Sequence, residues 1–260
     1  RPAIRTSGGW RGPEPVGLDR ETSLAGPGYV GEWMVYMGER RVVERQAHGQ
    51  RFELVVPERS TLAESPDAVL DSLTRASDQL RVGDRDERVV AFAVPTTSVT
   101  WAARGLQFGE TDMWVRDAEP LDTVENTWIH EYVHTRTDFE PTTGTQWTVE
   151  ALATYYAALL TVEQDLAPLS TFGPYLGQGG FPPHGSAVLS APRTWVSGAN
   201  YWKGGLVVGD LDRRIRVATD SELSFQTVFS GMNAHRGPLS GPDVERLVGA
   251  AGGPAVRDSF

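Results

Sequence analysis

Two histidines four residues apart are the residues of this 260-residue chain best placed to hold a metal ion. His130 and His134 begin and end the segment HEYVH. Residues four apart lie on one face of a helix, so both imidazoles can reach one ion. Glu131 is turned by about 100° from His130, so it lies beside the ion and can take a proton from a metal-bound water. The alternative is a buried helix that carries two histidines by chance, but the spacing favours a zinc site.

A catalytic zinc ion usually has three protein ligands and a water, so a third ligand is needed. Glu150 follows His134 after a connection, residues 138–144, that contains proline and glycine. We expect Thr145 to cap a second helix that runs to about residue 163, packs antiparallel to the first and returns Glu150 to the two histidines. The remaining histidines are isolated in the sequence and are weaker candidates: His48, His184 and His235.

The segments around these residues predict an α+β fold with a mixed sheet. We expect Asp122 and Glu125 to form a capping box for a helix over 123–135. Strands are predicted at 29–37, 41–47, 51–56, 89–94, 101–108 and 111–115, and a helix capped by Ser65 with Pro66 in its first turn runs to about 81. The second half predicts a long Gly/Pro-rich loop over 168–192 and helices at about 201–217, 225–233 and 242–250. The expected organisation is an irregular lead-in (1–28), an α+β lobe (29–137) and a helical lobe (138–260).

Composition limits the class of partner. The formal net charge is −10, which argues against nucleic acid, and Lys203 is the only lysine. No apolar run approaches the 18 residues or so that a membrane span needs. Cysteine is absent, so the compartment stays open, as does the oligomeric state. The sequence starts at Arg1 without Met or a signal peptide, and we expect it to be part of a longer chain that can be extracytoplasmic.

HEYVH followed by WTVEALATYY resembles the gluzincin metallopeptidases, in particular the glycyl aminopeptidases and, more distantly, the aminopeptidase N family. These families have a Trp three residues before the glutamate ligand, as Trp147 stands here, and a Tyr a few residues after it. NYWKG, residues 200–204, resembles a second family segment, Y-x-K-G, whose tyrosine donates a hydrogen bond to the tetrahedral intermediate. That tyrosine is Tyr201 here.

The resemblance implies a thermolysin-like catalytic domain with one Zn²⁺ at the seam between the two lobes. His130, His134 and Glu150 would be its ligands, and the domain would hydrolyse peptide bonds with Glu131 as base and Tyr201 as oxyanion donor. Whether it is an aminopeptidase or an endopeptidase stays open. The alternative is an inactive gluzincin-like module that only binds peptides.

The chain also departs from the family pattern. The spacing from the second histidine to the glutamate is shorter, and Ala151 replaces the usual glycine. The strand segment RGLQF carries Gln107 where aminopeptidases have a glutamate for the substrate amine, and a neutral amide cannot form that ion pair. We expect Gly105 and Gln107 to bind substrate along an edge strand, and Glu110 is a possible substitute for the missing acid.

Overall fold

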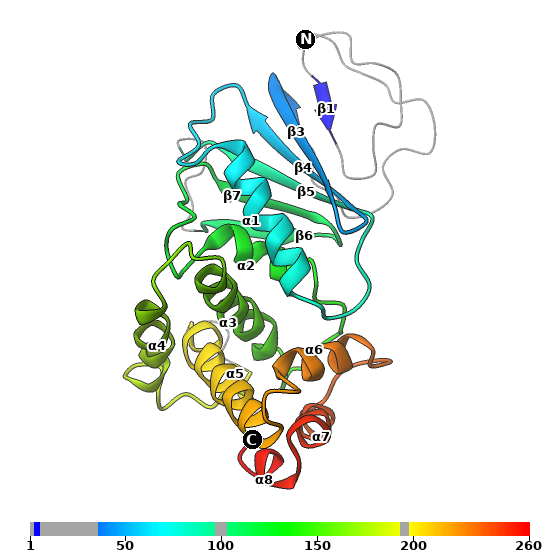
Figure 1. Ribbon diagram of the computed structural model, residues 1–260, viewed down its shortest axis with the longest axis vertical. Helices are drawn as coiled ribbons and strands as arrows, with labels where there is room; N and C mark the ends of the chain where they lie inside the picture. The colour runs from blue at the N-terminus through cyan, green and yellow to red at the C-terminus, as the bar shows by residue number, and fades with distance from the viewer. Residues whose placement is uncertain (1–2, 6–35, 97–102, 193–197) are drawn as a thin grey trace.

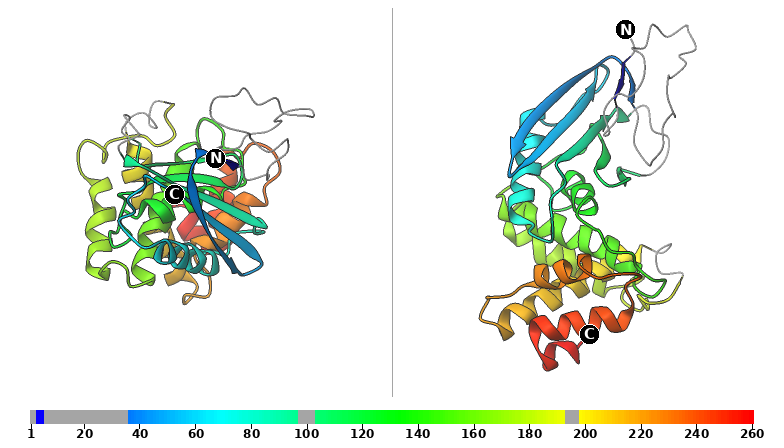
Figure 2. Two further views of the ribbon diagram at one scale, coloured as in Figure 1. Left: turned by 90° about the horizontal axis from the view of Figure 1, so that it is seen from above. Right: turned by 90° about the vertical axis from the view of Figure 1, so that its right-hand side faces the viewer.

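The computed structural model describes residues 3–5, 36–96, 103–192 and 198–260. A five-stranded sheet forms one end of the molecule and a group of helices forms the other (Figures 1 and 2). The predicted α+β class is therefore confirmed. The boundaries of the lead-in and of the two lobes stay predictions.

The main sheet has the order β3-β4-β5-β7-β6. Its central pairs, β4 with β5 and β5 with β7, are parallel, and its outer pairs are antiparallel, so the sheet is mixed as predicted. A two-residue turn at His48 and Gly49, with φ of 52° and 79°, joins the first two strands, which is the backbone that tight hairpins require. The strands are β3 (Arg40–Ala47), β4 (Gln50–Pro57), β5 (Arg88–Val94), β6 (Gly105–Phe108) and β7 (Asp112–Arg116).

A separate pair of short strands corrects the prediction of an irregular beginning. β1 (Ala3–Arg5) pairs antiparallel with β2 (Tyr36–Gly38). Most of the strand predicted at 29–37 lies outside the described residues, as do the first two residues of the strand predicted at 101–108.

Helix α1 (Pro66–Gln79) begins as its sequence predicts, because the side chain of Ser65 accepts a hydrogen bond of 3.1 Å from the backbone N–H of Ala68. Its buried face packs against the sheet and joins a core that extends into the helices. Alternate residues of β4 and β5 point to the opposite face of the sheet. There Val55, Val90, Phe92 and Trp114 form a second, smaller apolar cluster.

The helices after the sheet are α2 (Thr127–His134), α3 (Trp147–Glu163), α4 (Leu169–Gly177), the short 3₁₀ helix η2 (Gln178–Gly180), α5 (Ala199–Ala218), α6 (Phe225–Asn233), α7 (Gly241–Gly252) and α8 (Pro254–Arg257). No helix in the described part of the chain combines the length and apolarity needed to cross a membrane.

Two predicted features of the helical half are wrong. The stretch 168–192 is not a continuous loop, because α4 and η2 form within it, and buried Leu176 of α4 packs against the glycines of α5. Thr145 does not cap α3 either. The structure has Gln146 at that position without a side-chain hydrogen bond, while the hydroxyl of Thr145 donates to the carbonyl of Leu239 at 2.6 Å.

Helices α3 and α5 approach closely because α5 presents glycines to α3. A Cβ on Gly204 would lie 2.7 Å from Cβ of Ala151, which is closer than two carbons can pack. Gly204 therefore leaves the space that Ala151 occupies. This contact holds the first turn of α5, which carries Tyr201, beside the start of α3, which carries Glu150.

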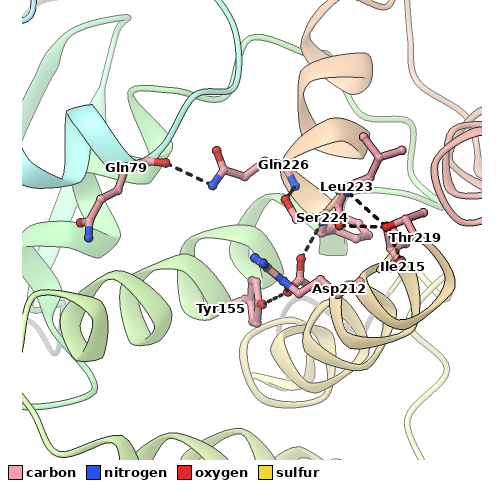
Figure 3. Close-up of polar contacts among 10 residues, drawn as sticks. Gln79, Tyr155, Asp212, Ile215, Thr219, Leu223, Ser224 and Gln226 are labelled. Atoms are coloured by element: carbon pink, nitrogen blue, oxygen red, sulfur yellow. Dashed lines mark hydrogen bonds and ion pairs between the residues drawn. The ribbon is translucent and has the colours of Figure 1, made fainter. Parts of the chain in front are cut away.

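A buried carboxylate joins the same two helices to α6 (Figure 3). Asp212 of α5 accepts hydrogen bonds from the hydroxyl of Tyr155 on α3 at 2.8 Å and from the backbone N–H of Phe225 on α6 at 2.6 Å. It also forms an ion pair of 2.6 Å with Arg216, one turn further along α5. The side chain of Asp212 thus fixes the relative placement of three helices.

Candidate metal centre and adjoining cavities

The helix that carries the two histidines begins later than its sequence predicts. Its N-cap is Asn126, whose side-chain oxygen accepts a hydrogen bond of 3.1 Å from the backbone N–H of Ile129. The predicted cap of Asp122 and Glu125 is wrong, because Glu125 forms an ion pair of 3.0 Å with Arg104 instead. Eight residues of helix are sufficient to place His130 and His134 on one face, toward α3.

Three donor atoms from α2 and α3 converge on one point. Nε2 of His130 lies 3.2 Å from Nε2 of His134, and each of these nitrogens lies 3.3 Å from Oε2 of Glu150. Ligand atoms about 2.0–2.2 Å from zinc at tetrahedral angles are separated by roughly 3.3–3.6 Å. Two imidazole nitrogens and one carboxylate oxygen in this triangle therefore fit a zinc ion that keeps a fourth position open.

His134 and Glu150 shift each other's pKa values. Burial disfavours the charged form of His134, but the hydrogen bond and negative charge of Glu150 outweigh it and raise the pKa of the imidazole. For Glu150, burial opposes ionisation, but the hydrogen bonds and charges of both histidines prevail and hold the pKa of the carboxyl well below its usual range. The site thus favours an ionised carboxylate as its oxygen donor.

Glu131 lies beside the triangle and is enclosed by strand β6. Its side chain is buried, which raises the pKa of the carboxyl, while the backbone N–H of Gln107 hydrogen-bonds it and works in the opposite direction. Gly105 allows this approach, because a Cβ there would lie 2.7 Å from both Cγ and Oε1 of Glu131. The strand therefore fixes the carboxylate next to the donor triangle.

The first turn of α5 covers the other side of the site. The ring of Tyr201 stacks on the ring of His130, with centroids 5.9 Å apart and planes at 11°. Burial raises the pKa of the Tyr201 hydroxyl, and the negative charge of nearby Glu150 adds to the effect. The hydroxyl is therefore a hydrogen-bond donor at neutral pH, at the edge of the site.

Sequence reasoning did not find the partner of Lys203. Its ammonium group donates to the backbone carbonyls of Gly185 and Ala187, at 2.9 and 2.6 Å. It thereby fixes a Gly/Pro-rich loop against the turn that carries Tyr201. The signal available in the sequence was that the only lysine of the chain stands two residues after that tyrosine.

Two cavities flank the donor triangle. One has a volume of about 320 Å³ and lies between the start of β6 and helices α2 to α5. The other, about 200 Å³, lies along β6 and is lined by Gly105, Leu106, Gln107, His130, Glu131, His134, Val149, Glu150 and Tyr201. His130, Glu131, Gly105 and Tyr201 border both cavities, so a bound chain that ran through both would pass over these residues.

The expected substrate residues are placed unequally. Gly105 and Gln107 line the second cavity, and the side-chain amide of Gln107 donates to the carbonyl of Gly109. Glu110 is exposed on the turn after β6, lines neither cavity and lies near the acidic residues Asp86 and Asp138. The geometry does not bring Glu110 to the donor triangle.

The remaining histidines lie elsewhere. Among the described residues, His130, His134 and Glu150 form the one group of three that could hold a metal ion. His48 lies 3.7 Å from Asp78, and His235 lies 3.8 Å from Asp243. His184 stacks on the ring of Trp202.

Solved structures of a zinc metallopeptidase and of aminopeptidases share this fold. An M1 zinc metallopeptidase mutant from Deinococcus radiodurans is 15% identical, with a TM-score of 0.65 over 99% of this chain and 60% of its own. An aminopeptidase N family protein from Idiomarina loihiensis has a TM-score of 0.58 at 15% identity, over 89% and 46%. Legionella pneumophila aminopeptidase A in complex with aspartic acid has a TM-score of 0.59 at 15% identity, over 86% and 28%.

The chain has the fold of the M1 zinc metallopeptidases. The similarity to zinc metallopeptidases expected from HEYVH is thereby confirmed at the level of the fold. The chain spans 60% or less of the length of each of these neighbours. No family model matches the sequence, and no curated protein does.

Proposed function

We propose that this chain is the catalytic part of a zinc-dependent peptidase with a thermolysin-like site at the seam between sheet and helices. The observation that carries the proposal is the triangle of His130, His134 and Glu150, with a buried carboxylate beside it and a tyrosine at its rim. One zinc ion per chain would be held by these three side chains. The fold of the M1 zinc metallopeptidases supports the assignment.

Zinc, when bound, supplies a Lewis acid that polarises a carbonyl and makes a water more acidic. The protein residues do the rest. Glu131 takes a proton from the attacking water and delivers it to the nitrogen of the leaving amine, and its burial suits a carboxylate that must hold a proton between these steps. The hydroxyl of Tyr201 donates a hydrogen bond to the oxyanion of the tetrahedral intermediate.

Strand β6 supplies the surface along which a peptide would lie. In the described part of the sheet only β7 pairs with it, so the other edge of β6 is available for an extended peptide. Gly105 and the carbonyl of Gln107 would contact that peptide, while the backbone N–H of Gln107 stays with Glu131. One M1 zinc metallopeptidase mutant with this fold was solved with a Tyr-Ser-Ala substrate.

The test combines metal analysis with peptide digestion. The zinc-loaded parent should hold about one zinc per chain and cleave peptides in a random library. Glu131→Gln should keep the zinc but lose a factor on the order of 10²–10⁴ in turnover, because it removes the base and leaves the ligands intact. His134→Ala should lose tight zinc binding, because two ligands remain.

Three results would contradict the proposal. Absence of zinc from the parent after loading would remove the metal site, and loss of zinc from Glu131→Gln would make that residue a ligand. A zinc-loaded parent that retains peptides without cleaving them would be the inactive binding module.

A further inference from the structure

The larger cavity beside the donor triangle has one aromatic wall and one charged wall. Tyr175 of α4 and Trp202 of α5 meet at a ring-centroid distance of 5.4 Å and both line it, with Ala157 of α3 next to them. His184 stacks on Trp202 with centroids 6.2 Å apart, which fixes the indole from outside the cavity. This wall is a surface for an unbranched apolar chain.

The charged wall has an excess of negative charge. Arg104 donates to the partly buried Glu119 at 2.7 Å and forms an ion pair of 3.0 Å with Glu125, so two carboxylates share one guanidinium. Glu119 also accepts a hydrogen bond from the hydroxyl of Thr127. Glu125 is 51% exposed and lines the cavity, so its carboxylate can accept further hydrogen bonds.

Aromatic rings beside a carboxylate that can accept further hydrogen bonds suit one class of side chain. The methylene stem of lysine or arginine packs on aromatic rings. Its cationic head is attracted both by the faces of the rings and by a carboxylate. A carboxylate side chain would find the guanidinium of Arg104 already paired with Glu119 and Glu125. The volume, about 320 Å³, is at the lower end of the range of ligand pockets and fits a single side chain better than a folded partner.

We propose that this cavity is a specificity pocket for a lysine or arginine side chain of the peptide residue next to the cleaved bond, with Glu125 as the residue that selects it. The placement next to the cleaved bond follows from the shared lining of cavity and site, since His130, Glu131 and Tyr201 border both. The inference rests on the proposed peptidase function.

The test uses N-acetylated pentapeptides that carry lysine, norleucine or glutamate at either of the two positions next to the cleaved bond. The three side chains are similar in length and differ in charge. At one of the two positions, lysine should raise kcat/KM about tenfold over norleucine, and glutamate should lower it. In Glu125→Gln the lysine-to-norleucine ratio should fall close to one, and in Glu125→Lys glutamate should overtake lysine.

Glu245→Gln is the matched control, since it removes the same charge from an exposed residue of α7, a helix that does not line the cavity (Figure 1). It should keep the parent ratio. If the Glu125 variants fail to fold, Trp202→Leu should lower the same ratio by removing the indole from the aromatic wall. The circular dichroism spectrum of each variant shows whether it is folded.

Calorimetric binding to Glu131→Gln separates this inference from the peptidase proposal, because it needs no turnover. Tighter binding of the lysine peptide than of the norleucine peptide supports the pocket even if no peptide is cleaved. Cleavage with equal rates for lysine and norleucine at both positions, or a preference for glutamate, would overturn the pocket and leave the peptidase intact.

Discussion

At the scale of single residues, the missing acid on β6 sets the expected cleavage position. The cavity that runs along β6 contains Gln107, whose amide is engaged with Gly109, and among the described residues that line it the only carboxylates are those of Glu131 and Glu150. Neither is free to hold an ammonium group if both serve the metal site. We therefore expect free and N-acetylated versions of one peptide to be cleaved at similar rates.

The measurement is kcat/KM for that matched pair. One lost charge-assisted contact is worth roughly 1.5–3 kcal/mol, or one to two decades of selectivity. Gln107→Glu should restore a preference for the free amine. A hundredfold preference in the parent would show that another acid reaches the amine.

The role of the Tyr201 hydroxyl can be tested by removing that group alone. Tyr201→Phe removes the hydroxyl and keeps the ring that stacks on His130. Because the hydroxyl acts on the oxyanion, kcat should fall on the order of 10²-fold while KM and zinc content stay close to the parent values. Steady-state kinetics and elemental analysis check this. Unchanged kcat would remove Tyr201 from the mechanism.

At the scale of elements, Asp212 holds α3, α5 and α6 in the arrangement that brings Glu150 and Tyr201 together (Figure 3). Asp212→Ala should lower the free energy of unfolding by about 3 kcal/mol, because it leaves the Tyr155 hydroxyl and the Phe225 N–H buried without their acceptor. Tyr155→Phe, the matched control, should cost only about 1 kcal/mol. Urea denaturation measures both, and equal effects would contradict this role.

At the scale of the whole molecule, zinc should stabilise the fold, because it binds the folded chain at a site assembled from two helices. Zinc at about 1,000 times its dissociation constant adds about 4 kcal/mol, which for a chain of this size raises Tm by roughly 10 °C. Calorimetry with zinc or with a chelator measures the shift. His134→Ala should show almost none, and an equal Tm for the parent in both conditions would contradict the site.

Resistance to acid should depend on Asp117, which joins the end of β7 to two loops. Its buried carboxylate accepts hydrogen bonds from the backbone N–H groups of Thr61 and Thr96 at 2.7 and 2.9 Å. Burial raises its pKa, but these bonds and those from the Ser60 and Thr96 hydroxyls outweigh it and lower the pKa. The stabilisation is thus complete above the ordinary aspartate pKa, about 3.9, and is lost as pH falls from there through the lowered pKa.

Asp117→Asn should cost about 1–3 kcal/mol at neutral pH, and the difference from the parent should shrink as pH falls below about 4. Denaturation at several pH values, with chelator present throughout, checks the sign. A difference that grew on acidification would contradict it.

The sequence by itself determined the local features. Ser65 and Pro66 begin α1 as predicted, and the spacing of His130 and His134 placed two imidazoles on one helical face. Each of these depends on backbone geometry within a few residues, which sequence encodes directly. The choice of Glu150 as third donor also came from the sequence, through a short loop that had to reverse the chain.

Tertiary structure decided everything that depends on a distant partner. The sequence predicted Glu125 as part of a helix cap, but in the structure Glu125 forms an ion pair with Arg104. The N-cap is Asn126 instead, and the pair of Glu125 and Arg104 forms the charged wall of the cavity. Helix α4 forms within the Gly/Pro-rich stretch because Leu176 can pack against glycines of α5. In both cases an interaction with a residue far along the chain overrides the local propensity. A local sequence pattern does not contain such a partner.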